Sequence, residues 1–216
     1  MKIDLSGKRA VITGGSRGIG RAIALCCAEA GAAVSVCARA AAGLSAVREE
    51  IAAHEVAAHT QACDVADGAA LKAYIAAAAT ALGGIDILVC NASALATNDD
   101  EAGWSRSIDV DLLGTVRAIR AAVPHLEKGG TGAIVNIASI FGLRTWGSPP
   151  YGTLKGALIQ LTRTYAATLA SKGIRVNCVA PGSILASSHQ RSSQASRLLT
   201  SRWPAQVMFR MIRVVS

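Results

Sequence analysis

Short apolar runs alternate along the chain with longer, alanine-rich stretches of mixed polarity. The runs at residues 33–38 (AVSVCA), 85–90 (IDILVC) and 134–138 (IVNIA) are nearly continuous rather than strictly alternating. Such runs are typical of parallel strands that are covered on both faces, whereas the longer stretches have the apolar spacing and alanine content of helices. The pattern therefore predicts an α/β fold, a doubly wound parallel sheet with helices on both faces.

We expect strands and helices in alternation. The strands are expected near residues 8–13, 33–38, 56–63, 85–90, 134–138 and 176–180. The helices are expected near residues 17–30, 41–53, 67–82, 99–127 and 151–171. No internal repeat or linker interrupts this order, and 216 residues suffice for one α/β domain but hardly for two. We therefore expect one domain over residues 1–185, followed by an atypical basic tail over residues 186–216.

The amino-acid composition limits the classes of protein to which the chain can belong. Only 4% of the residues are aromatic and 51% are hydrophobic, which favours close packing of helices on a sheet. No apolar run approaches the ~20 residues of a membrane-spanning helix, and the first residues lack the apolar segment of a signal peptide, so we expect a soluble, cytoplasmic protein with no membrane partner. The six cysteines form no CxxC pair and no cluster with histidine, which favours buried free thiols over disulfides or a metal site.

The formal net charge of +8 is unevenly distributed along the chain. All 14 acidic residues lie before residue 128, whereas residues 128–216 contain 11 basic residues. A cationic half of this kind suits nucleic acid or an acidic carrier, but it lacks interleaved aromatic residues and any known nucleic-acid module. We expect no nucleic-acid partner, and keep nucleic-acid binding as the least favoured alternative.

The stretch at residues 13–20, TGGSRGIG, follows the first apolar run and opens the first helix. A glycine-rich turn at this place binds phosphate groups, because the helix N-terminus offers free N–H groups and the positive end of its dipole. Gly14 allows a tight turn, Gly18 lets a pyrophosphate approach the backbone, and Gly20 lets the helix pack closely on the strand. The predicted phosphate site of a dinucleotide consists of Gly14, Ser16, Arg17, Gly18, Ile19 and Gly20.

Polar residues follow the ends of the other predicted strands, where a cofactor would lie. Arg39 ends the second strand, and together with Arg17 it favours NADP over NAD, because guanidinium groups match a 2′-phosphate. The alternative is that Arg39 is an ordinary solvated loop residue. Asp64, followed by Val65, suits an adenine amino group or caps the helix that begins near residue 67. The candidates after the fourth strand are Asn91, Ala92 and Ser93.

The residues that carry chemistry lie between the fifth strand and the last predicted helix. Tyr151 and Lys155 are four residues apart and therefore share one face of a helix. A free phenol has a pKa of about 10, which a neighbouring ammonium lowers, so such a pair suits the proton transfer that accompanies hydride transfer. Ser139 ends the fifth strand and can hydrogen-bond a substrate oxygen near the tyrosine. Together with the glycine-rich turn, these residues predict a nicotinamide-dependent oxidoreductase.

The chain resembles the short-chain dehydrogenase/reductase family over residues 7–182. The resemblance rests on TGGSRGIG at 13–20, CDV at 63–65, NAS at 91–93, IAS at 137–139, YGTLK at 151–155 and NCVAPG at 177–182. It implies a Rossmann-type fold with NAD(P)(H) as the cofactor. In such enzymes the tyrosine is the general acid and base, the lysine also contacts the nicotinamide ribose, and the serine orients the substrate.

The resemblance also implies a role for the segment after the sixth strand. There the backbone after Pro181, with Gly182 and Ile184, would meet the nicotinamide carboxamide. The helices near residues 104–127 and 151–171 correspond to those that pair subunits in such enzymes. A homodimer or homotetramer is therefore expected.

Asp111 departs from the family pattern. At this helix position the family usually has an asparagine, which holds a water in the proton path to the lysine. An aspartate can hold a water too, but its negative charge near Lys155 would offset part of the effect of the lysine on Tyr151. We expect a relay with a shifted pH optimum, and count Asp111 among the catalytic candidates.

The tail is the larger departure, because family members continue with a substrate-covering segment and a last strand. Residues 186–216 contain five arginines, no acidic residue and no family pattern. One interpretation is a truncated or frame-shifted ending, which leaves the last strand missing and the strand near 176–180 as an exposed edge. The other is a genuine variant tail with its own lid or partner.

The sequence thus predicts an NADP(H)-preferring oxidoreductase, with NAD as the alternative cofactor. Its partner would be a small-molecule carbonyl, which it reduces reversibly, or a secondary alcohol, which it oxidises, with Tyr151 relaying the proton. The residues that select this substrate are expected in residues 143–150, around Leu95 and in the segment after Pro181. The competing interpretation is a catalytically impaired dinucleotide-binding or scaffold protein whose pocket does not close.

Overall fold

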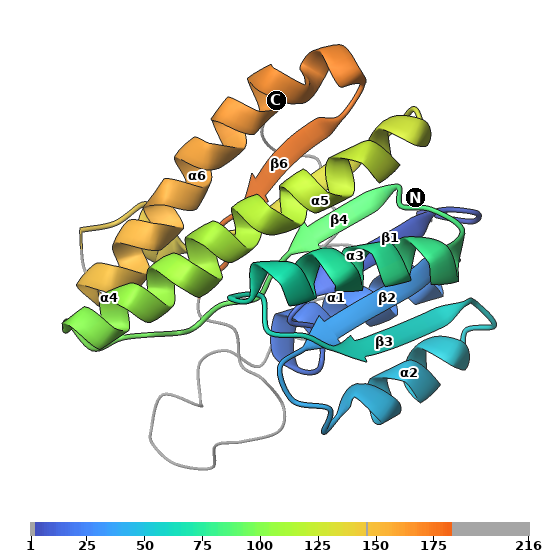
Figure 1. Cartoon of the computed structure of the whole chain (residues 1–216), viewed down its shortest axis with the longest axis horizontal. Coiled ribbons are helices and arrows are strands. Elements are labelled where there is room, and N and C mark those ends of the chain that lie inside the picture. The colour runs from blue at the N-terminus through green and yellow to red at the C-terminus, as the bar shows by residue number, and fades with distance from the viewer. Residues whose placement is uncertain (1–2, 146, 183–216) are drawn as a thin grey trace.

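Six parallel strands form one sheet in the order β3-β2-β1-β4-β5-β6 (Figure 1). The structure is a computed structural model that describes residues 3–145 and 147–182. The strands are β1 Arg9–Thr13, β2 Ala33–Ala38, β3 Ala58–Ala62, β4 Ile87–Cys90, β5 Ala133–Ile137 and β6 Arg175–Val179. The chain runs outward from β1 to β3 and then returns to the other side of β1 for β4. The predicted doubly wound parallel sheet is confirmed.

Helices cover both faces of this sheet, as the pattern of buried strand residues requires. Ala10 and Ile12 point to the face that is covered by α1 and α2, whereas Val11 and Leu88 point to the face that is covered by α3 and α5. The helix α6 lies on the same face as α5 (Figure 1). The α-helices are α1 Gly18–Glu29, α2 Leu44–Ala52, α3 Gly68–Leu82, α4 Glu101–Ser107, α5 Gly114–Lys128 and α6 Pro149–Leu169.

The segment that was predicted as one regular helix over residues 99–127 differs from that expectation. Between α4 and α5 lies a π-helical segment, Ile108–Leu113, in which each turn is wider than in an α-helix. A hydrophobic pattern cannot reveal such a turn, because the turn changes the hydrogen-bond partners rather than the polarity of the residues. The π-helical segment contains Asp111, which is only 1% exposed.

The helix that carries the predicted catalytic pair begins earlier than expected, at Pro149 rather than Tyr151. Proline suits this place because its fixed φ angle fits the first turn of a helix, where no N–H group is needed. Tyr151 therefore lies within the first turn of α6. The cysteines are all free, as predicted, although Cys26 and Cys178 are half-buried rather than buried.

Some expectations concern residues that the structure does not describe. The missing last strand, the boundary at residue 185 and the nature of the tail all lie outside the described residues. Within the described part of the chain, β6 and β3 are the two edge strands, and no helix is long and apolar enough to cross a membrane. The described part contains 16 basic and 14 acidic residues, so most of the formal charge of +8 comes from other residues.

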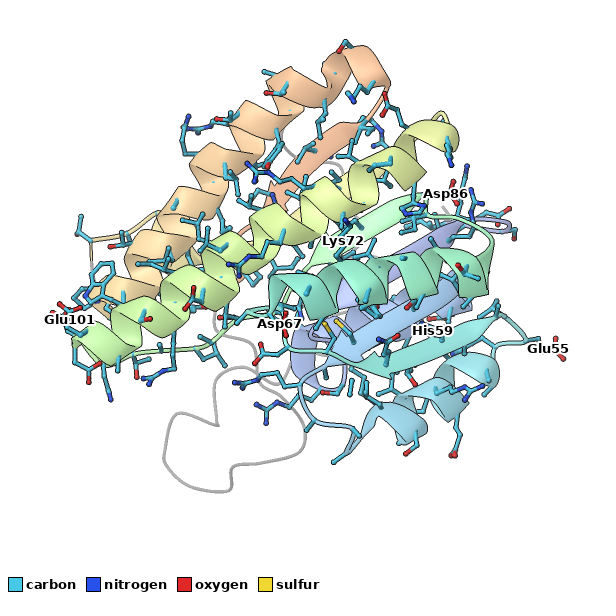
Figure 2. All side chains as sticks on the ribbon, in the orientation of Figure 1. Glu55, His59, Asp67, Lys72, Asp86 and Glu101 are labelled. Atoms are coloured by element: carbon cyan, nitrogen blue, oxygen red, sulfur yellow. The ribbon has the colours of Figure 1, made fainter. Side chains whose placement is uncertain are left out.

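One ion pair joins β1 to the start of β4 at the amino ends of the strands. The Arg9 side chain contacts both carboxylate oxygens of Asp86, with Nε–Oδ2 and Nη2–Oδ1 distances of 2.7 and 3.0 Å, and the Arg9 backbone N–H donates to Oδ2 at 2.9 Å. Asp86 is only 4% exposed, and Figure 2 shows it at this end of the sheet. The hydrogen bond from Arg9 holds the pKa of the Asp86 carboxyl below its ordinary range.

We expect Asp86→Asn to lower the free energy of unfolding by about 2 kcal/mol near neutral pH, because the arginine loses a buried, charged partner. A carboxyl group whose pKa is lowered by folding stabilises the protein above its unfolded pKa and loses this effect as the pH falls through its folded pKa. The difference between the variant and the unchanged protein should therefore shrink below about pH 4 in denaturant titrations.

Glu50→Gln is the matched control for this experiment. It removes the ion pair of Arg21 with Glu50, whose side chains are 41% and 38% exposed, and should change stability by less than about 0.5 kcal/mol. Equal losses for the two variants at neutral pH would contradict the importance of the buried pair.

Candidate active site

A pocket of about 500 Å³ opens at the carboxyl ends of the strands, where the strand order reverses between β1 and β4. Open α/β sheets bind their ligands at this point. The predicted site residues that line the pocket are Gly14, Ser16, Arg17, Gly18, Ile19, Gly20, Arg39, Val65, Asn91, Ala92, Ser93, Ser139, Tyr151, Lys155, Pro181 and Gly182. Asp64 and Asp111 do not line it, and Ile184 lies outside the described residues.

The glycine-rich turn packs closely against the end of β4 and leaves free space beside Gly18. Gly14 has a φ angle of +69°, and a Cβ atom there would come within 2.8 Å of the Ala92 Cα atom. A Cβ atom on Gly20 would overlap the carbonyl oxygen of Gly14, so this glycine allows α1 to approach the turn. At Gly18, whose φ angle is +58°, a Cβ atom would meet no protein atom within 4 Å. The turn is thus tight against β4 and open beside Gly18.

Asn91 fastens the glycine-rich turn to the end of β4. Its side-chain amide donates to the carbonyl oxygens of Thr13 and Gly14 at 3.0 and 2.8 Å. In return, the Thr13 hydroxyl oxygen accepts hydrogen bonds from the backbone N–H groups of Asn91 and Ala92 at 3.1 and 3.2 Å. These bonds fix the two strand ends that frame the pocket.

The predicted catalytic side chains converge at the other side of the pocket. Lys155 is 2% exposed, and its ammonium group donates to the carbonyl oxygen of Ile137 at 3.0 Å. The same group lies 5.6 Å from the centre of the Tyr151 ring, one turn earlier on α6. Phe141 packs edge-on against this ring, with a centroid distance of 5.9 Å. Ser139 lies at the end of β5 and lines the pocket with Tyr151 and Lys155.

Asp111 lies behind Lys155. Its Oδ1 atom is 3.1 Å from the lysine ammonium, so the two groups are in direct contact. Its Oδ2 atom accepts a hydrogen bond from the backbone N–H of Ala94 at 2.9 Å. One carboxylate thus holds both the buried lysine and the segment that follows β4, and the negative charge that was expected near Lys155 is adjacent to it.

Arg17 and Arg39 lie on the glycine-turn side of the pocket. Both side chains are exposed, and neither makes a hydrogen bond or ion pair with the described residues. Asp64 is exposed too, and its Oδ1 atom accepts from the backbone N–H of Ala66 at 3.0 Å. It does not cap α3, because Asp67 accepts from the first N–H groups of that helix. The helix-cap alternative for Asp64 was therefore wrong.

The pocket lining also includes residues to which no cofactor or catalytic role was assigned, namely Ala38, Ala40, Ala42, Cys63, Leu95, Val110, Ile137 and Ala138. Cys63 directly follows β3, and both this strand end and the CDV motif at 63–65 pointed to this residue. Leu95 is 62% exposed and has a φ angle of +50°, a rare conformation for leucine. No sequence pattern predicts that conformation.

Comparisons with known proteins agree with this geometry. The sequence profile of the family described as short chain dehydrogenase matches residues 8–197. The chain belongs to this short-chain dehydrogenase family. It is 40% identical over 184 residues to the 3-oxoacyl-(acyl-carrier-protein) reductase FabG of Staphylococcus aureus, and this match covers 82% of the chain and 75% of the reductase.

Solved structures of similar proteins have the same fold. A putative short-chain alcohol dehydrogenase from Sinorhizobium meliloti matches with a TM-score of 0.83 and 39% identity, over 88% of this chain and 77% of that one. The L-sorbose reductase of Gluconobacter frateurii, solved with NADPH and L-sorbose, matches with a TM-score of 0.82 and 34% identity, over 87% and 73% of the two chains. The chain is therefore an oxidoreductase of this family in sequence and in fold.

Proposed function

We propose that this short-chain dehydrogenase is an NADP(H)-dependent enzyme that reversibly reduces a small-molecule carbonyl to a secondary alcohol. The observation that carries the proposal is the convergence of Ser139, Tyr151 and Lys155 on one wall of the pocket, opposite the glycine-rich turn. A phenol, an ammonium group and a hydroxyl on one wall suit proton transfer to a carbonyl oxygen.

The residues present fit a dinucleotide. The open space beside Gly18 and the uncapped N-terminus of α1 leave room and N–H donors for phosphate groups. Asn91 and Thr13 hold this turn rigidly against β4. The pocket extends from Arg39 to Gly182, which suits an elongated ligand with phosphate groups at its middle.

When bound, the reduced nicotinamide supplies the hydride. The Tyr151 hydroxyl would donate its proton to the substrate oxygen during reduction and take it back during oxidation. Lys155 would stabilise the phenolate that forms, and the Ser139 hydroxyl would donate a hydrogen bond to the same substrate oxygen. Because Lys155 is almost fully buried, its charge is little screened by water.

Arg17 and Arg39 support NADP(H) over NAD(H). Both arginines are exposed on the glycine-turn side of the pocket and free of partners among the described residues, so their guanidinium groups are available to a 2′-phosphate. Assembly into a homodimer or homotetramer and a cytoplasmic location remain predictions from the sequence.

Tyr151→Phe tests the proposed reaction. It removes the proton donor but keeps the aromatic ring, so turnover with a panel of ketones and aldehydes should fall by about 100-fold or more. The dinucleotide affinity should stay within about twofold, as followed by the fluorescence of the reduced nicotinamide. Tyr165→Phe, a half-buried tyrosine of α6 that does not line the pocket, is the control and should keep full turnover.

Dinucleotide binding by the unchanged protein without turnover on any carbonyl would favour the competing interpretation, an impaired dinucleotide-binding or scaffold protein. Equal activity of Tyr151→Phe and Tyr165→Phe would show that the phenol at residue 151 does not transfer the proton.

Arg39→Ala tests the cofactor preference. The loss of a charge-assisted contact should weaken NADPH binding by about tenfold, whereas NADH binding should change by less than about twofold. Titrations of the two reduced cofactors measure both values. Arg48→Ala, an exposed arginine of α2 outside the pocket, should change neither. Equal weakening of NADPH and NADH by Arg39→Ala would contradict a 2′-phosphate contact.

Asp111→Asn tests the role of the buried carboxylate. The substitution removes a negative charge beside Lys155 and so favours the loss of a proton from a neighbouring phenol. We expect the rising limb of the pH profile of kcat/KM for alcohol oxidation to move to lower pH. Asp109→Asn, a half-buried position in the same π-helical segment, should leave the profile in place. A pH profile of Asp111→Asn that superimposes on that of the unchanged protein would show that the charge of Asp111 does not affect the proton relay.

A further inference from the structure

A row of polar side chains crosses the apolar layer between the sheet and α3. His59 on β3 contacts the Ser35 hydroxyl on β2, with an Nδ1–Oγ distance of 2.8 Å. The Ser35 hydroxyl contacts the Tyr74 hydroxyl of α3 at 3.0 Å. Ser35 and Tyr74 are both 0% exposed, and His59 stacks on the Tyr74 ring. Figure 2 shows His59 on the sheet and Asp67 at the N-terminus of α3.

The row continues through two thiols to the pocket. The Tyr74 hydroxyl interacts with the Cys37 thiol on β2, and the Cys37 thiol interacts with the thiol of Cys63, which follows β3 in the same buried cluster. The backbone N–H of Cys63 donates to the carbonyl oxygen of Ala38 at 2.9 Å, so Cys63 is joined to the residue that follows Cys37. The row therefore links His59 to the wall of the dinucleotide pocket.

The hydrogen bonds of this row can all run in one direction. If the Nδ1 atom of His59 carries its proton, each group accepts from the group before it and donates to the next, and Cys63 is the last acceptor. The bond from Cys37 lowers the pKa of the Cys63 thiol, even though burial, Asp64 and Asp67 oppose this. The same bond, together with burial, raises the pKa of Cys37 well above its ordinary value.

Cys63 differs from the other cysteines in its access to ligands. It lines the pocket, whereas no other cysteine of the described residues does so. Cys63 is only 5% exposed, so a reagent reaches it through the pocket rather than from the outer surface. A thiol with a hydrogen-bond donor beside it and an open route to solvent is suited to react as a thiolate.

We propose that Cys63 is a modification site, a nucleophilic thiol that a hydroperoxide oxidises, with Cys37 as the resolving thiol that closes a disulfide. The Cys63 thiolate attacks one peroxide oxygen, the O–O bond breaks, and the leaving oxygen takes a proton and departs as water or an alcohol. The Cys37 sulfur then attacks the sulfur of the Cys63 sulfenic acid, and the displaced hydroxyl takes the Cys37 proton as water. Two thiols lose two electrons and two protons, and one peroxide is reduced.

This step has a consequence for the pocket. The disulfide draws the Cys63 sulfur toward Cys37 and away from the lining, and it also removes the hydrogen bond that Cys37 shares with Tyr74. A dinucleotide in the pocket should in turn shield Cys63. The shielding rests on the proposed function, whereas the reaction of the two thiols does not.

The test uses the full-length protein without cofactor. The protein is treated with hydrogen peroxide, the remaining thiols are blocked with iodoacetamide, and peptides are mapped by mass spectrometry. We expect a disulfide between Cys37 and Cys63 before any other cysteine is modified. In Cys37→Ala the Cys63 sulfenic acid should persist and be trapped by dimedone. Reaction of Cys26 before Cys63, or a disulfide between other cysteines, would overturn the proposal.

Two further variants sharpen the result. Cys26→Ser removes a half-buried thiol of α1 outside the row and should leave the disulfide yield unchanged. Ser35→Ala interrupts the row and should slow the alkylation of Cys63 by iodoacetamide several-fold, because Ser35 no longer donates to Tyr74, the group next to Cys37. An unchanged alkylation rate in Ser35→Ala would show that the row does not activate Cys63.

Saturating NADPH separates this proposal from the proposed function. It should slow the oxidation of Cys63 by about tenfold if the dinucleotide fills the pocket. If NADPH binds but gives no protection, the assignment of Cys63 to the wall of the dinucleotide pocket is wrong. If NADPH does not bind at all while the disulfide forms, the proposed function fails and the thiol site stands.

Discussion

The candidate active site depends on a buried ammonium group that must be compensated. Lys155 is 2% exposed, and an unpaired charge at such a place would be costly. Three separate parts of the chain meet at this group, and two of them compensate its charge. The first turns of α6 bring the lysine in, the end of β5 offers the carbonyl oxygen of Ile137, and the π-helical segment between α4 and α5 presents Asp111. The convergence of these elements also determines where Tyr151 and Ser139 lie.

Asp111 compensates the charge of the Lys155 ammonium group more strongly than a neutral residue would. A carboxylate in direct contact with the lysine neutralises it before any substrate or cofactor is present, so the pair can stay buried in the empty protein. The same carboxylate holds the backbone of Ala94, next to Leu95 at the mouth of the pocket. The charge of the site and the position of its entrance are therefore linked through one side chain.

Most of the fold could be predicted from the sequence, because near-continuous apolar runs that alternate with alanine-rich stretches form parallel sheets covered by helices, and six strands are too few for the eight-stranded barrel. Most predicted site residues follow strand ends, and the topology of a parallel sheet brings such ends together at one edge. The π-helical segment could not be predicted, because its residues keep the polarity of an ordinary helix. The direct contact of Asp111 with Lys155 depends on that wide turn. The row from His59 to Cys63 was also missed, because it joins residues of separate elements that no short motif connects.

The hydrogen bonds of Asn91 with Thr13 and Gly14 determine when the phosphate site can form during folding. Residues 13 and 91 are 78 positions apart in the chain, so the glycine-rich turn gains its partners only after β4 has docked on β1. Contacts between distant residues form slowly, because the intervening chain must first close into a loop. A nascent or partly folded chain that contains the whole TGGSRGIG motif therefore lacks a finished phosphate site. Capture of a phosphate-bearing ligand by this turn would report that the central strands have assembled, and not merely that the first helix has formed.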